Sequence, residues 1–263
     1  MKYDYQPKKF KTFKMPWENT LYMGVELEID LNRDLGYSCS YHVNMLMKKL
    51  NVIHGHFKKI KNNIFYFKYD GSVSNGTEIV SSPFTLQYAN KKLNWKSIFE
   101  NIKENNFFTS SSTGLHVHLN RNFFTNNDIE KLKMFFYTNK EKLFQFSGRE
   151  NIDNTYCQYQ YKNIKDFLSG PKYVGGRYWA VNTNSRHPTI EIRIFKSTLN
   201  YKKMKAILQF CDAISHYIKE IGIINSSKEG GWDRFLDWCK YKNGYDLFIK
   251  YQDKGDVWKN TYI

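Results

Sequence analysis

Apolar and polar residues alternate in the first extended segment of the chain, residues 21–31. In the stretch YMGVELEID, three aliphatic residues alternate with Glu26 and Glu28. A period of two is typical of a β-strand with one buried face, so both carboxylates point to the same side. At the rise of a strand they stand roughly 6.6 Å apart, which suits binding of neighbouring divalent cations. Taken alone, the stretch is equally compatible with the exposed polar face of an edge strand.

The rest of the pattern predicts strands and helices in mixed order. Alternating, β-branched or aromatic segments predict strands at residues 63–69, 77–82, 114–120, 177–183 and 189–195. Apolar residues at helical spacing predict helices at about 41–50, 86–105, 126–146 and 201–221, with one or two short helices within 226–263. Residues 51–57 are ambiguous, with a short strand as one interpretation, and 147–176 are expected to be a long loop or irregular insert. No internal repeat is visible, so one α+β domain is expected.

Composition narrows the class of protein. With 263 residues and 41% hydrophobic content, the chain can bury one substantial core. No apolar run reaches the length of a membrane span, and the N-terminus lacks the apolar region of a secretory signal. We therefore expect a soluble cytoplasmic protein without a membrane partner. The four cysteines show no CxxC spacing and are expected to be reduced packing residues.

The net charge of +15 allows two interpretations. A basic surface can bind nucleic acid. However, the lysines are scattered and accompany a high content of Asn, Ile, Tyr and Phe, as expected from an AT-rich genome. A polyanion such as a nucleoside triphosphate would also be attracted by this charge. A nucleic-acid partner is therefore the less favoured interpretation.

Three predicted strands share one arrangement of ionisable residues. Glu26-Leu27-Glu28, His116-Val117-His118 and Glu191-Ile192-Arg193 each place two ionisable side chains on one face and an apolar one on the other. Asp70, at the end of one strand, and Glu78, inside the next, add two carboxylates. The repetition predicts a sheet with one polar, functional face. Carboxylates with one imidazole suit Mg²⁺ or Mn²⁺ better than zinc, and such ions relieve the repulsion between carboxylates.

Each of these residues also has a purely structural interpretation. The HxH pair at 116–118 is compatible with ordinary strand histidines, and Asp70 with the first residue of a turn. Glu191 and Arg193 could form a salt bridge. His54 and His56, which flank a glycine, are expected to lie in a loop.

Taken in order, the motifs resemble those of the amidoligase family, found in many bacterial and phage genomes and related to glutamine synthetase and the glutamate–cysteine ligases. The resemblance rests on GVELE, DGS…NGTEIVSSP, TGLHVHL, RYWAVN and TIEIRIF, and it covers roughly residues 20–215. It implies a curved antiparallel sheet, a half-barrel, with helices on its outer face. Within a single catalytic domain of residues 1–263, an N-terminal arm (1–19) and a helical C-terminal extension (220–263) flank this core.

The resemblance also implies roles for individual residues. Two or three Mg²⁺ ions would be held by Glu26, Glu28, Asp70, Glu78, His116 and Glu191. His118 would approach the nucleotide phosphates, Arg193 the transferred phosphate, and Arg177 a substrate or phosphate group. Arg149, in SGREN, is a further candidate for nucleotide binding. Catalysis is thus expected to rest on Arg193, Arg177 and the metal ligand Glu191.

The expected activity is ATP- and Mg²⁺-dependent joining of a carboxylate to an amine through an acyl phosphate. The substrates would be amino acids, peptides or proteins. The sequence has neither GxxxxGK[ST] nor GxGxxG, which agrees with a site where metal ions hold the phosphates. Two alternatives remain at this point. One is a metal-dependent hydrolase or nuclease using the same carboxylates, and the other is a basic nucleic-acid-binding protein without catalysis.

Overall fold

The computed structural model describes most of the predicted core. The described residues are 12, 20–31, 39–59 (with side chains from 45), 64–68, 76–149, 157–159, 178–185, 187–222 and 231–253. Asp70 and Arg177 lie outside them, as do most of the predicted arm at 1–19 and of the insert at 147–176.

Within the described residues, the strands form one seven-stranded antiparallel sheet with the order β2-β3-β1-β5-β7-β6, and β4 pairs with β1. The strands are β1 (Met23–Leu31), β2 (Phe65–Lys68), β3 (Gly76–Ser81), β4 (Phe107–Phe108), β5 (Gly114–Asn120), β6 (Val181–Asn182) and β7 (Thr189–Lys196). The sheet confirms the α+β class. It also places the motif at residues 22–30 in the middle of the sheet, between β3 and β5, rather than at an edge.

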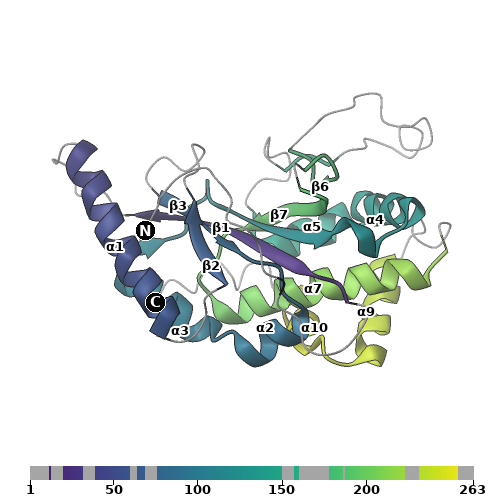
Figure 1. Cartoon of the computed structure of the whole chain (residues 1–263). Helices are drawn as coiled ribbons and strands as arrows, with labels where there is room; N and C mark the ends of the chain where they lie inside the picture. The colour runs from purple at the N-terminus through teal and green to yellow at the C-terminus, as the bar shows by residue number, and fades with distance from the viewer. Residues whose placement is uncertain are drawn as a thin grey trace.

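The described residues also form eight α-helices. They are α1 (Cys39–Lys59), α2 (Leu86–Lys92), α3 (Trp95–Glu104), α4 (Asn126–Thr138), α5 (Lys140–Ser147), α7 (Tyr201–Glu220), α9 (Gly231–Lys242) and α10 (Asp246–Tyr251), with a short 3₁₀ turn, η1 (Arg121–Phe123). In Figure 1, α2, α3, α7, α9 and α10 lie below the sheet. None of the described helices combines the length and the apolar character needed to cross a membrane.

The alternation in β1 determines which side of the sheet faces the helices. Met23, Val25, Leu27 and Ile29 are at most 2% exposed and belong to the core. They share one hydrophobic core with the buried stripe of α7, in which Met204, Ile207, Phe210, Cys211 and Ile214 are fully buried. The glutamates of β1 consequently face away from the helices. The described cysteines 157, 211 and 239 are free and buried, as expected for packing residues.

Three predicted helices differ from the observed ones. The short strand considered at 51–57 is wrong, because α1 continues to Lys59 and buries Ile53 and Phe57. His54 and His56 therefore lie on a helix and not in a loop. The helix predicted at 86–105 is two helices, because Asn94 caps α3 with its own side chain.

The predicted helix at 126–146 is also interrupted, at Asn139 between α4 and α5. Its predicted start is confirmed, since Thr125 forms a capping box with Asp128. The strand predicted at 177–183 is limited to Val181–Asn182 in the part of that segment that the structure describes.

Candidate functional site

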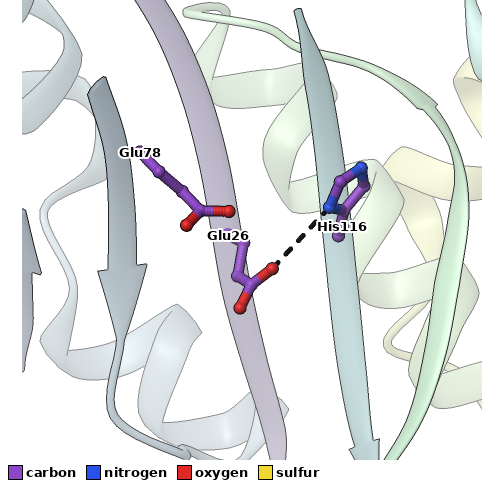
Figure 2. Close-up of side chains that lie close together, drawn as sticks. All are labelled: Glu26, Glu78 and His116. Atoms are coloured by element: carbon purple, nitrogen blue, oxygen red, sulfur yellow. Dashed lines mark ion pairs between the residues drawn. The ribbon is translucent and has the colours of Figure 1, made fainter. Parts of the chain in front are cut away.

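The polar face of the sheet brings together side chains from four adjacent strands. Antiparallel pairing sets Glu28 opposite Glu78, Glu26 opposite His116, and His118 opposite Glu191. Directly opposed residues in such a ladder project from the same face and lie close together. Figure 2 shows this for Glu78, Glu26 and His116, which come from β3, β1 and β5 and converge.

Among the described residues, two groups have the composition and spacing to hold a metal ion. One is Glu26, Glu78 and His116, and the other is Glu26, His118 and Glu191; within each group the ligand atoms lie within 4.8 Å of one another. Glu26 belongs to both groups. Its Oε2 atom is 3.7 Å from His116 Nδ1 and 3.3 Å from His118 Nε2. The central glutamate of the sheet therefore joins the two groups.

The two histidines each direct one nitrogen, which makes no hydrogen bond, at these carboxylates. His116 Nδ1 and His118 Nε2 are buried and make no hydrogen bond. His116 is only 6% exposed, and its Nδ1 atom faces both Glu26 and Glu191, the latter at 3.4 Å. Buried polar atoms in folded proteins almost always have a partner. A nitrogen buried among carboxylate oxygens fits the donor set of a divalent cation such as Mg²⁺ or Mn²⁺.

The electrostatic environment favours positive charge. Burial would raise the pKa of Glu26, but His118 and His116 outweigh it and hold that pKa well below its ordinary value. Burial would likewise lower the pKa of His118, but Glu26 and Glu191 raise it. The pKa of Glu191 is also lowered, because His116, His118 and Arg193 outweigh its burial. Glu26 and Glu191 thus remain ionised at neutral pH although they are largely removed from water.

Two basic side chains are already bonded to the outer carboxylates. Lys68 Nζ lies 2.8 Å from Glu78 Oε2 across the β2–β3 pair. On the other side, Arg193 donates to Glu191 Oε1, and Asn182 Nδ2 donates to Glu191 Oε2 at 2.8 Å. The salt bridge between Glu191 and Arg193 that the sequence allowed is therefore present. It leaves Arg193 at the edge of the candidate metal groups.

Glu28 and Arg149 lie beside these groups and have other partners. The backbone N–H of Gly114 donates to Glu28 Oε2 at 2.5 Å, and Glu28 is outside both groups. Arg149 donates from Nε to the carbonyl of Ile194 at 3.3 Å and from Nη2 to that of Phe195 at 3.0 Å. These carbonyls lie at the register shift between β5 and β7, where Leu115 pairs with Phe195 but Val117 with Ile192. Arg149 thereby supports the irregular part of the strand that carries Glu191 and Arg193.

The comparison with known families agrees with the motifs of the sequence. A family model described as "putative amidoligase enzyme" matches residues 140–215. The resemblance to amidoligases is confirmed over this segment. The comparison with curated proteins finds no match.

The amidoligase match covers α5, β6, β7 and most of α7. It therefore includes Arg149, Glu191 and Arg193 of the site described above. Their partners Glu26, Glu78 and His116 come from strands earlier in the chain, and the sheet brings them to the matched segment. The match supports a ligase.

Three residues of this site were not predicted as site residues. Asn182 orients Glu191, and Thr189 Oγ1 lies 3.0 Å from His118 Nδ1, which directs Nε2 toward Glu26. Lys68 is bonded to Glu78. Both Asn182 and Thr189 lie within motifs that carry the family resemblance, RYWAVN and TIEIRIF, so position in those motifs was the available indication. Lys68 lies outside the motifs that carry the resemblance, so they gave no indication of it.

Gly114 is where a side chain would disturb the site. A Cβ atom there would lie 3.0 Å from His116 Nε2, 3.1 Å from Arg149 Nη2 and 3.4 Å from Glu28 Oε2. We expect Gly114→Ala to displace His116 and Arg149, to weaken Mn²⁺ binding, and to lower the free energy of unfolding by about 1–3 kcal/mol. Isothermal titration with Mn²⁺ and urea denaturation measure the two effects.

The matched control is Gly24→Ala, on the same face of the neighbouring strand. A Cβ atom at Gly24 would meet Ser81 at 3.8 Å, an ordinary contact distance. This variant should keep the wild-type Mn²⁺ affinity. Equal effects of the two substitutions on Mn²⁺ binding would contradict the importance of the close approach at Gly114.

Proposed function

We propose that the protein is an ATP- and Mg²⁺- or Mn²⁺-dependent carboxylate–amine ligase that forms an amide or isopeptide bond through an acyl phosphate. The observation that carries the proposal is the pair of candidate cation groups joined at Glu26 on one face of the sheet. The amidoligase match, which includes Glu191 and Arg193, supports the same class of reaction. We also propose a more specific fold, the half-barrel of the glutamine synthetase and glutamate–cysteine ligase type.

The described residues supply a donor set suited to divalent cations, with ligand atoms within 4.8 Å of one another in each group. We propose Glu26, Glu78, His116 and Glu191 as ligands, in agreement with the sequence motifs. His118 shares a group with Glu26 and Glu191, so we propose a ligand role for it in place of the phosphate contact that the resemblance implied. When bound, divalent cations would neutralise phosphate charge during transfer. Glu28 and Asp70 remain proposed further ligands.

The basic side chains would complete the site for phosphoryl transfer. In the first step, an oxygen of the substrate carboxylate attacks the γ-phosphorus of ATP, and ADP leaves. In the second step the amine attacks the acyl carbon, loses a proton, and inorganic phosphate leaves. Arg193 is proposed to contact the transferred phosphate, since it already lies against Glu191 at the edge of the cation groups. Arg177 and Arg149 are proposed to contact substrate or nucleotide.

Two measurements on the full-length protein test this function. Binding of a fluorescent ATP analogue should require Mg²⁺ or Mn²⁺ and should be lost with EDTA. ADP and phosphate should then form in equal amounts when amino acids or peptides that supply a carboxylate and an amine are added. Mass spectrometry should find a product lighter than its two substrates together by one water. Absence of metal-dependent ATP binding would contradict the proposal, and ATP-independent bond cleavage would favour a hydrolase.

A further inference from the structure

Lys68 is the basic residue of the site whose role is not explained by the proposed reaction. It lies at the end of β2, directly opposite Glu78 in β3. The Glu78 side chain is 2% exposed and that of Lys68 is 23% exposed. A carboxylate buried to this extent requires a counter-charge. Lys68 supplies part of it, through the 2.8 Å contact between Nζ and Oε2.

The same carboxylate belongs to one of the two candidate cation groups. Glu78 shares that group with Glu26 and His116, whose Nδ1 atom is buried without a hydrogen bond. The ammonium of Lys68 and a divalent cation would therefore compete for one carboxylate. Arg193 has the equivalent relation to Glu191 in the other group.

The charges of the site make this competition effective. With neutral imidazoles, the three carboxylates of the two groups and the two basic side chains leave one unit of negative charge. One divalent cation reverses the sign of that charge, and a second would enter against a positive field. Without the Lys68 charge the same groups leave two units of negative charge, so one divalent cation makes the site neutral and a second no longer enters against a positive field.

We propose that Lys68 is a resident cation of the site, which holds Glu78 and reduces the occupancy of the Glu26–Glu78–His116 group by divalent cations in the nucleotide-free protein. The inference rests on the proposed metal site. Lys68 would then neutralise part of the carboxylate charge, which the sequence motifs alone attribute to metal ions. A purely structural cross-strand ion pair would stabilise the sheet without affecting metal binding.

Mn²⁺ titration of the full-length, nucleotide-free protein tests the inference, with free Mn²⁺ measured by electron paramagnetic resonance. Lys68→Gln is expected to bind Mn²⁺ at least about tenfold more tightly than wild type, or to bind an additional ion, because a nearby unit charge is lost. Lys68→Arg keeps the charge and should behave like wild type. Lys240→Gln breaks an exposed ion pair with Asp237 on α9 and should also leave Mn²⁺ binding unchanged.

Thermal unfolding provides the second measurement. Without metal, Lys68→Gln should have a lower melting temperature than wild type, because Glu78 has lost a counter-charge. Mn²⁺ should raise the melting temperature of this variant by more than it raises that of wild type. If the variant is unfolded without metal, Mn²⁺ should fold it. Mn²⁺ affinity and Mn²⁺-dependent stabilisation that equal those of wild type would overturn the inference.

The outcomes separate this inference from the proposed function. If wild type binds Mn²⁺ and Lys68→Gln binds it no more tightly, the role of Lys68 is overturned while the metal site stands. If only Lys68→Gln binds Mn²⁺, competition by Lys68 is supported. If neither protein binds Mn²⁺, the metal site fails and the inference fails with it.

Discussion

Replacement of Glu26 by glutamine is expected to abolish metal-dependent activity and to weaken Mn²⁺ binding by more than about a hundredfold. Loss of a residue that only orients a metal ligand typically costs 10–100-fold, and Glu26 is a candidate ligand in both cation groups. Glutamine keeps the shape of the side chain but removes the charge that His116 and His118 face. ATP turnover and Mn²⁺ titration measure the two losses.

The fold should survive this substitution. The Glu26 side chain is 20% exposed and lies on the face of the sheet away from the α7 core. The circular dichroism spectrum of Glu26→Gln should therefore match that of wild type, and unfolding should remain cooperative. Glu100→Gln is the control, since Glu100 on α3 is 56% exposed and forms a 3.8 Å ion pair with Lys96. A Glu26→Gln variant with wild-type Mn²⁺ affinity would contradict the role of Glu26 as a shared ligand of the two groups.

Replacement of Phe210 by alanine is expected to have the opposite effect, a large loss of stability with little direct effect on the site. Phe210 is fully buried on α7, with ring centroids 5.3 Å from Phe248 and 5.4 Å from Phe146. It also contacts the rings of Phe136, Phe195, Trp232 and Phe235. Removal of a ring enclosed on so many sides leaves a cavity, and we expect a loss of about 3–5 kcal/mol in the free energy of unfolding.

Urea denaturation measures this loss, and Phe210→Leu should lose less because it leaves a smaller cavity. Below its melting temperature, Phe210→Ala should still bind Mn²⁺ with near wild-type affinity, since Phe210 is on the helical side of the sheet. A loss of stability below about 1 kcal/mol would mean that the surrounding rings close the cavity. Loss of Mn²⁺ binding in the folded variant would mean that the core and the polar face are more tightly coupled than their separation on opposite faces suggests.

The predictions of strands and helices were correct where the local sequence pattern determines the structure. The strands at residues 21–31, 114–120 and 189–195 and the helix at 201–221 agree with the observed elements because each has an uninterrupted period of two or of about 3.6. The predictions at 51–57 and 86–105 failed for local reasons. Gly55 and two histidines obscured a helix that continues to Lys59, and the Asn94 cap divides a continuous amphipathic pattern. The two-residue strand β4 was too short to have a pattern.

The sequence also determined which residues share a polar face. Alternation alone places Glu26 with Glu28, His116 with His118, and Glu191 with Arg193, because successive side chains of a strand point to opposite sides. The order of the motifs led to the amidoligase family, and the match over residues 140–215 agrees with it.

Only the tertiary structure decided how these pairs meet. Strand order and register are set by contacts between distant segments, and they place Glu26 opposite His116 and His118 opposite Glu191. They make Glu26 common to both cation groups and direct Glu28 to the backbone of Gly114 instead. They also bring Lys68 against Glu78. A one-residue change of register would turn each of these side chains to the other face, so no pattern within a single strand could have specified these partners.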